Sequence, residues 1–226
     1  MSFEINCSNC GAPSSVSVGI CPYCKKTFKN KKRKKDESPL ISRIKADYKA
    51  GKVDNVISAC KQMYATKEKM RENNNFLLIY LKALLEIDGP ATLIRSIVSQ
   101  LLINDPTNSE ALDILYILEA RDELSTEKND PGEKKLKAII QRSPNNAYAH
   151  FFLGAHLFWI DKDYMQATYY LEKAVKHRPN FLRAWGCLGA LYKELENEVL
   201  SKRAFAKAAK IETNTRMKKF FRQQSK

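Results

Sequence analysis

The chain has 226 residues, 44% of them hydrophobic, and a formal net charge of +14 at neutral pH. Its longest apolar run, from Phe151 to Ile160, is far shorter than the roughly 20 residues of a membrane-spanning helix, which excludes an integral membrane span. The charge is concentrated, because residues 25–35 and 202–226 each carry +8 whereas residues 36–201 carry −1. The body of the chain is therefore nearly neutral.

The first segment holds two pairs of cysteines at a spacing typical of metal ligands. Cys7 and Cys10 form one CxxC pair, and Cys21 and Cys24 form a second pair after ten intervening residues. Two such turns facing each other supply the tetrahedral thiolate shell that zinc prefers, and four cysteines leave no open position for catalysis. We therefore predict one structural Zn²⁺ ion, bound by these four cysteines. A redox dithiol is the alternative, but it normally has a single CxxC at a helix start.

The residues around these cysteines resemble a zinc ribbon, a small β module. Val16, Val18 and Ile20 alternate with small or polar residues, which is the pattern of a short strand. The resemblance implies a ribbon over residues 3–28, which bury too little apolar surface to fold without the metal. Metal-binding cysteines, and an N-terminus without the basic and apolar regions of a signal peptide, predict a cytoplasmic location.

A basic linker follows over residues 29–38. It contains five consecutive cationic residues, Lys31, Lys32, Arg33, Lys34 and Lys35. Three interpretations remain open: a solvated spacer, non-specific contact with the phosphates of RNA or DNA, and a nuclear-import or docking segment for an acidic protein. Lysine dominates and aromatic residues are few, so the linker offers affinity for phosphate without base readout.

Amphipathic or buried segments with a helical period fill most of residues 40–214. Pro106, Pro144 and Pro179, each followed within two residues by asparagine, mark places where one helix stops and the next begins. About five helical pairs are expected from this punctuation. The segments are a helix–turn–helix over 41–67 and helices near 76–87, 92–103, 110–124 and 133–140.

The last two pairs are copies of one unit. Gly154 recurs 35 residues later as Gly189, each preceded by leucine, and Ala174 recurs 34 residues later as Ala208. Small residues at these positions let two helices cross closely. The difference of one residue between the two spacings predicts an insertion near residues 160–164, in the turn between two helices.

With Trp185, Tyr192 and Phe205 added, this pattern resembles the tetratricopeptide repeat (TPR), and the best copies cover residues 147–180 and 181–214. The resemblance implies a mainly α protein. Its fold would be a TPR-like α-solenoid of right-handed, stacked helical hairpins over residues 40–214, preceded by the small β zinc ribbon. A solenoid of this kind presents an extended, curved surface that binds other molecules.

The final segment, residues 215–226, is predicted to form a basic capping helix. Its apolar residues share one face, so they could cover the end of the last repeat while the cations face water. The alternative is a basic amphipathic helix on an anionic membrane. The apolar face carries Met217, Phe220 and Phe221, and the cations are Lys218, Lys219 and Arg222.

What the TPR resemblance implies about function is binding of a protein or peptide along the concave face formed by the first helix of each pair. We therefore predict a non-enzymatic adaptor or scaffold with a structural zinc ribbon. The alternative is a nucleic-acid-associated factor that uses the ribbon and the basic linker for phosphate contact. The residues expected nearest the concave face are His150, Ala155, Phe158, Arg183, Ala190 and Lys193.

No catalytic motif stands out. The sequence has no glycine-rich phosphate loop, no nucleophile elbow and no HExxH motif. His150, His156 and His177 are expected to pack or to cap helices, and Cys60 and Cys187 to be small buried residues. Some members of the TPR family bind the terminal carboxylate of a partner through an asparagine just after the Leu-Gly pair. The corresponding residues here are Ala155 and Ala190, so that binding mode is not indicated.

Overall fold

A computed structural model describes residues 4–6, 13–15, 38–124 and 131–226 of the chain. The chain divides into two units, Met1–Pro39 and Leu40–Lys226. Cys7, Cys10, Cys21 and Cys24, the strand expected near residues 16–20 and the five cations from Lys31 to Lys35 lie outside the described residues. The zinc site and the phosphate contacts therefore remain predictions.

In the first unit, the described residues form a two-stranded antiparallel sheet. Strand β1 (Glu4–Asn6) pairs with strand β2 (Pro13–Ser15), with Asn6 opposite Pro13 and Glu4 opposite Ser15. The segment that connects the strands includes Cys7 and Cys10. Since directly opposed residues in an antiparallel pair lie about 5 Å apart, the two ends of this connecting segment are held close together.

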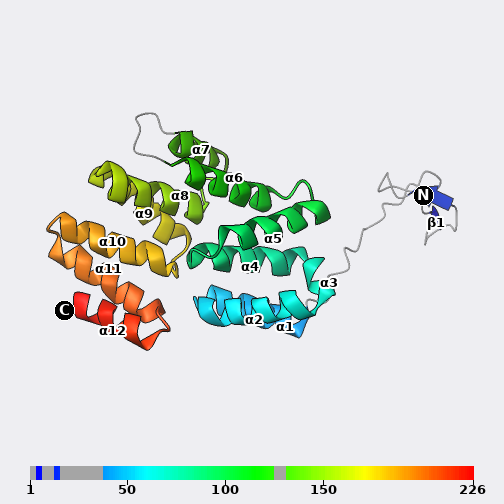
Figure 1. Cartoon of the computed structure of the whole chain (residues 1–226), viewed down its shortest axis with the longest axis horizontal. Coiled ribbons are helices and arrows are strands. Elements are labelled where there is room, and N and C mark those ends of the chain that lie inside the picture. The colour runs from blue at the N-terminus through cyan, green and yellow to red at the C-terminus, as the bar shows by residue number, and fades with distance from the viewer. Residues whose placement is uncertain (1–3, 7–12, 16–37, 125–130) are drawn as a thin grey trace. The chain divides into compact units, whose positions relative to one another are not determined.

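The second unit is helical, and its helices follow one another as antiparallel pairs (Figure 1). Residues 38–124 and 131–226 contain five pairs, namely α1–α2, α4–α5, α6–α7, α8–α9 and α10–α11, with α3 and α12 in addition. The predicted array of helical hairpins is thereby confirmed. The bounds are α1 Pro39–Lys49, α2 Val53–Thr66, α3 Glu68–Arg71, α4 Asn74–Glu86, α5 Ala91–Asn104, α6 Ser109–Glu123, α7 Pro131–Arg142, α8 Ala147–His156, α9 Tyr164–His177, α10 Leu182–Glu194, α11 Glu198–Ile211 and α12 Thr215–Gln224.

Asparagine or aspartate side chains begin six of these helices. At α8, the Asn146 side chain accepts hydrogen bonds from the backbone N–H groups of Tyr148 and Ala149, which have no partner within the helix. These caps help α6 and α8 to restart directly after the turns that contain Pro106 and Pro144, whereas α10 starts after the Pro179 turn without a side-chain cap. The other five caps are Asn73, Asn108, Asp163, Asn197 and Asn214.

The turn inside a pair has a recurring backbone conformation. Gly51, Asp88, Lys162 and Glu196 each have a positive φ, between 55° and 78°, and each lies just before the second helix of its pair. This left-handed conformation suits glycine and costs other residues on the order of 1 kcal/mol or more. The repeat is therefore visible in the backbone of pairs that share no sequence pattern.

The predicted close crossings occur at Gly154 and Gly189. A Cβ atom at Gly154 would lie 2.8 Å from Leu171 Cγ on α9, and one at Gly189 would lie 2.7 Å from the Phe205 ring on α11. Both distances are below van der Waals contact, so only glycine permits these helices to approach so closely. Beside the predicted insertion, α8 continues as a π-helical turn, η2 (Leu157–Asp161), which accommodates an additional residue.

The larger of two apolar core clusters runs through the hairpins from α1 to α11, and α4 and α8 are its most buried helices. A smaller cluster joins α11 to α12. Nine consecutive or near-consecutive residues of α4, from Phe76 to Glu86, are buried. A helix that is apolar on nearly all sides must be surrounded by other elements. At the other end of the unit, α12 packs on α11, where the Phe221 ring stacks against Phe205 at a centroid distance of 6.2 Å.

Candidate functional site

Two of the residues expected on the concave face lie in the interior. His150 and Phe158 are 3% and 1% exposed. The His150 ring stacks on His177 of α9 at a centroid distance of 5.7 Å, and its Nε2 atom lies 2.9 Å from the Pro144 carbonyl oxygen. Both residues therefore support the packing of α8 on its neighbours and present no surface to a partner. Burial lowers the pKa of His150, which favours the neutral imidazole.

The other residues expected on that face are partly or fully accessible. Arg183 is half-buried, donates to the Leu85 carbonyl oxygen at 3.3 Å and pairs with Asp88 at 3.5 Å. Lys193 is exposed and donates to the Gln224 side chain at 3.3 Å. Ala155 and Ala190 are half-buried. The six residues thus do not form one shared surface.

The structure instead brings together four polar residues that are far apart in the sequence. Glu86, at the end of α4, accepts hydrogen bonds at Oε1 from the hydroxyl of Tyr48 at 2.8 Å and from that of Tyr148 at 3.0 Å. The Arg178 Nε atom donates to the same oxygen, and the Arg178 guanidinium lies 3.9 Å from the centre of the Tyr48 ring. We call these four residues the central polar cluster.

Burial dominates the electrostatics of the central polar cluster. The Glu86 side chain is 3% exposed and that of Arg178 is 15% exposed. Burial raises the pKa of Glu86, and the neighbouring Arg178 opposes this by favouring the carboxylate. Burial also raises the pKa values of Tyr48 and Tyr148 well above the usual value, so both phenols stay protonated and donate. Among the described residues, none forms a hydrogen bond with the buried Glu86 Oε2 atom.

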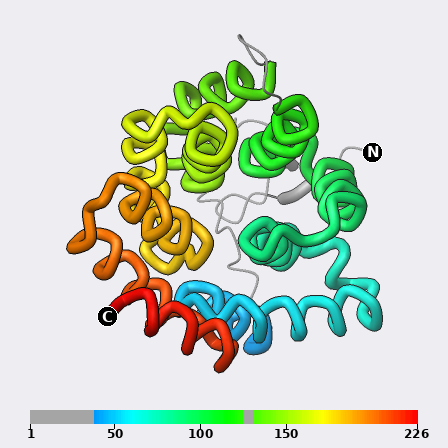
Figure 2. The backbone as a smooth tube through the Cα atoms, turned by 60° about the vertical axis from the view of Figure 1, so that its left-hand side comes forward, coloured from blue at the N-terminus to red at the C-terminus, as the bar shows by residue number. Residues whose placement is uncertain are grey.

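Around the central polar cluster, the first hairpin contacts the last repeats. The Asn180 side chain, between α9 and α10, donates to the Lys49 carbonyl oxygen at 2.7 Å. Thr213, between α11 and α12, donates to the Asp54 carboxylate on α2. Figure 2 shows the helices of this unit curving around until α12 comes back beside the first hairpin. We call these interactions the closure contacts.

The closure contacts change what the inner face can do. The sequence predicts an extended, curved surface along the first helices of the pairs, but in the described helices the central polar cluster joins three of these helices, α1, α4 and α8, directly to one another. The physical reason is curvature, because the C-terminal end of α4 comes within hydrogen-bond distance of side chains at the starts of α8 and α10. Beside this contact, the inner face is hollowed into a local pocket.

Such a pocket lies beside the central polar cluster and has a volume of about 400 Å³. Its walls come from α4, the start of α6, the α7–α8 turn, the start of α8 and the end of α9. Three of the five helical pairs and the end of α1, which belongs to a fourth pair, thus contribute to one cavity. We call it the inner pocket, and its polar lining includes Lys82, Ser109, Glu110, Asp113, Ser143, Asn145, Asn146 and His177.

Some polar groups of the inner pocket already have ion-pair or hydrogen-bond partners within the protein, and others do not. Lys82 pairs with Glu110 at 2.6 Å. Asp113 is 5% exposed, and it accepts hydrogen bonds from Arg142 and from the Asn146 side chain. By contrast, the exposed Asn145 amide makes no hydrogen bond within the part of the chain that the structure describes. It can both donate to and accept from a ligand.

Sequence reasoning missed most of the inner pocket. It also placed His150, on α8, and Phe158, on η2, at the concave face, although the sequence contains a signal that both are buried. His150 lies four residues before Gly154 and Phe158 lies four residues after it. Residues four apart share one face of a helix, so all three face α9, which Gly154 allows to approach closely. No such local signal marks Glu86 or Arg178.

No protein-family model matches the sequence, and no curated protein matches it either. Several solved structures resemble the fold. A MamA crystal structure is 21% identical over 76% of this chain and 89% of that chain, with a TM-score of 0.39. A thermophilic TPR protein of Thermus thermophilus, TTC0263, is 13% identical over 84% of this chain and 98% of that chain, with a TM-score of 0.49. Among the described helices, none has the length and apolar character needed to cross a membrane.

Proposed function

We propose that the protein is a non-enzymatic adaptor that uses TPR-like repeats to bind an extended segment of a protein partner in the inner pocket. The observation that carries this proposal is the convergence of donors and acceptors from four helical pairs on one cavity of about 400 Å³. An extended peptide has unpaired backbone N–H and C=O groups that need such partners. The free Asn145 amide at the edge of the pocket suits this role.

The arrangement of hydroxyl groups favours binding over turnover. Ser109 and Ser143 both line the inner pocket together with His177. Activation of a hydroxyl nucleophile requires a base within hydrogen-bond reach. Within the described helices, neither serine is hydrogen bonded to His177. Burial and the nearby Lys176 and Lys173 lower the pKa of His177, so it is a neutral donor or acceptor for a ligand at neutral pH.

Affinity purification with the full chain tests the inner pocket. We expect the double variant Asn145→Ala and His177→Ala to lose a partner that the unaltered protein captures, because two groups that contact the partner are removed. The matched control is Asn55→Ala with Lys61→Ala, which changes two exposed residues of α2 that do not line the inner pocket. Capture of every partner by the pocket variant at unaltered yield would contradict the proposal.

The proposal includes a structural zinc ribbon in the first unit. Its support is the donor set, because four thiolates at Cys7, Cys10, Cys21 and Cys24 match a closed tetrahedral site. The pairing of Asn6 with Pro13 adds support, since it holds together the ends of the segment that carries the first two cysteines. These residues would bind the ion and stabilise the ribbon, and no chemical reaction is assigned to the metal.

Metal content and thiol reactivity test the ribbon. We expect about one zinc per purified chain, and no alkylation by iodoacetamide at pH 7.5 until a chelator frees four cysteines. The other two cysteines should not add to the number of alkylated thiols. Burial raises the pKa of Cys60 and of Cys187 to about 12, which keeps these two thiols protonated and unreactive in the folded protein. A metal-free chain whose four N-terminal cysteines react at once would refute the site.

A further inference from the structure

The hairpin formed by α11 and α12 is far more basic than the rest of the described chain. Residues 198–226 contain nine cationic and two acidic side chains, a formal charge of +7. One of the two acids, Glu212, is only 8% exposed and accepts a hydrogen bond from the Asn214 backbone. The exposed cations within the two helices form what we call the C-terminal basic surface: Arg203, Lys207, Lys210, Arg216, Lys219 and Arg222.

The cations of this surface are not neutralised by neighbouring acids. In residues 38–124 and 131–226, none of the six lies within 4.0 Å of a carboxylate oxygen, and Lys202 is the one cation of the hairpin that does, pairing with Glu198 at 3.3 Å. Elsewhere in the unit cations are commonly paired, as in Lys82 with Glu110 and Lys137 with Glu133. The hairpin therefore presents positive charge with few acids to offset it.

Helix stability does not account for this arrangement. Lys210 and Arg222 occupy last turns, where a cation interacts favourably with the helix dipole. Arg216, however, is in the first turn of α12, where a cation opposes the dipole. Arg203 and Lys207 are like charges four residues apart, an arrangement that destabilises a helix by about 0.2–0.5 kcal/mol. An anion bound across the hairpin would remove both penalties.

A bilayer is a poor occupant for this surface. A membrane-surface helix buries its apolar face in the lipid. In α12 the central residue of that face, Phe221, is 9% exposed because it packs against Phe205 and beside Gly186. Only Met217 and Phe220 of that face remain exposed, and two side chains bury little apolar area. The apolar face of α12 is thus already used by the protein, and its cations stay in water.

We propose that the C-terminal basic surface binds the sugar–phosphate backbone of a nucleic acid, without reading its bases. The match is one of charge, since rows of cations at helical spacing oppose a regular row of phosphates and binding releases condensed counterions. Arg203, Lys207 and Lys210 form one such row on α11, at i, i+4 and i+7. This function is separate from partner binding in the inner pocket.

The test measures the salt dependence of binding by the full chain to a fluorescent 20-base-pair duplex of mixed sequence and to a 20-nucleotide single-stranded RNA. The variant Arg203→Gln, Lys207→Gln and Lys210→Gln should bind roughly tenfold or more weakly at low salt, and its slope of log K against log salt should be smaller by about 2 to 3. A second variant, Arg216→Gln, Lys219→Gln and Arg222→Gln, should show the same changes. All six side chains are exposed, so the melting temperature should change little.

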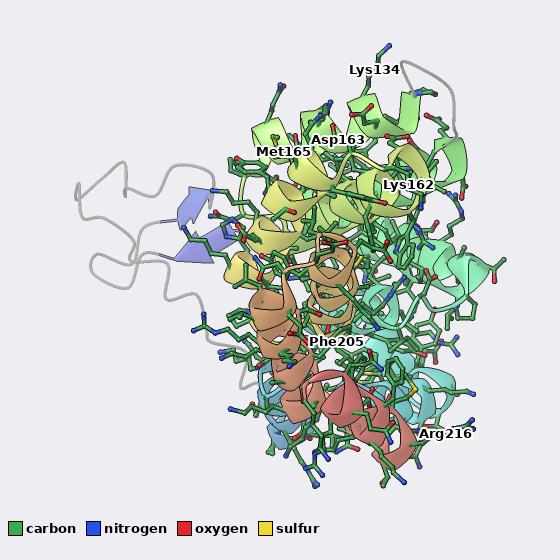
Figure 3. The ribbon with its side chains drawn as sticks, turned by 90° about the vertical axis from the view of Figure 1, so that its left-hand side faces the viewer. Lys134, Lys162, Asp163, Met165, Phe205 and Arg216 are labelled. Carbon is green, nitrogen blue, oxygen red and sulfur yellow. The ribbon has the colours of Figure 1, made fainter. Side chains whose placement is uncertain are left out.

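The matched control removes three positive charges elsewhere, as Lys69→Gln, Lys134→Gln and Lys162→Gln, all at exposed residues. Figure 3 shows Lys134 and Lys162 at the opposite end of the helical unit from Arg216. This control should retain the affinity and slope of the unaltered protein. The basic linker is the same in every variant, so its contribution to binding stays constant. An equal loss in the control, no binding of either oligonucleotide, or tighter binding to phosphatidylserine vesicles or polyglutamate than to the duplex would overturn the proposal.

Discussion

Replacing Arg178 with methionine is expected to lower the free energy of unfolding by about 3–5 kcal/mol, because the change leaves the Glu86 carboxylate buried without its cation. Glu86 is 4% exposed, and Arg178 is its only cationic partner in the described helices. Methionine retains much of the packing of the arginine stem, so the loss reports mainly on charge. Equilibrium urea unfolding followed by circular dichroism measures it.

Three comparisons make this result specific. Arg95→Met removes an ion pair with Asp122 whose side chains are 39% and 63% exposed, so it should cost less than about 1 kcal/mol. The double variant Glu86→Gln and Arg178→Met removes both buried charges and should recover a large part of the loss. An Arg178→Met protein as stable as the unaltered chain would show that the central polar cluster contributes nothing.

The loss of unfolding free energy in Arg178→Met should also depend on pH, and the pKa of Glu86 determines whether it grows or shrinks as the pH falls. Burial already raises this pKa in the folded state, and removing Arg178 takes away the main interaction that lowers it. A raised pKa means that the folded state favours the protonated acid, so the penalty is present at high pH. The deficit of Arg178→Met should therefore shrink as the pH falls towards 4.5, the ordinary pKa of glutamate.

Two glycines of α10 are expected to respond in opposite directions to the same substitution. Gly189→Ala should destabilise the protein by about 1–3 kcal/mol, because the added methyl group would lie 2.7 Å from the Phe205 ring, which is held by Phe221. Gly186→Ala should stabilise it by about 0.5–1 kcal/mol, because its methyl group would meet Phe221 at an ordinary 3.5 Å and alanine favours the helix.

This pair of variants is internally controlled, since both positions lie in one helix and gain the same helix propensity. The difference in unfolding free energy between them isolates the close crossing of α10 and α11. Melting temperatures from differential scanning calorimetry are sufficient to rank the three proteins. Equal effects of the two substitutions would mean that α10 and α11 can separate without cost, and that the recurring Leu-Gly pattern does not mark a tight helix crossing.

Much of the helical architecture could be predicted because its causes are local. Proline followed within two residues by asparagine predicts where one helix stops and the next begins, and the starts of α6, α8 and α10 bear this out. The positions of Gly154 and Gly189 predict close crossings that depend on one helix and its immediate neighbour. Periodicity of apolar residues supplies the remaining helix bounds to within a few residues.

The central polar cluster could not be predicted, because its cause is cumulative. Tyr48 and Arg178 are 130 residues apart, and they meet only because small rotations between successive hairpins add up to a closed curve. No single interface specifies that sum. Read in isolation, Glu86 is an ordinary acid at a helix end, and nothing in its neighbouring sequence indicates burial. The inner pocket depends on the same curvature and was therefore also beyond prediction.

The closure contacts set a limit on how this chain can evolve. Open solenoids lengthen or shorten by duplicating or losing a unit, because each unit touches only the next. Here Asn180 and Thr213 contact the first hairpin, so a sixth complete hairpin would separate Lys49 and Asp54 from their partners. The number of hairpins is therefore tied to the closure contacts as well as to the packing of each unit on the next.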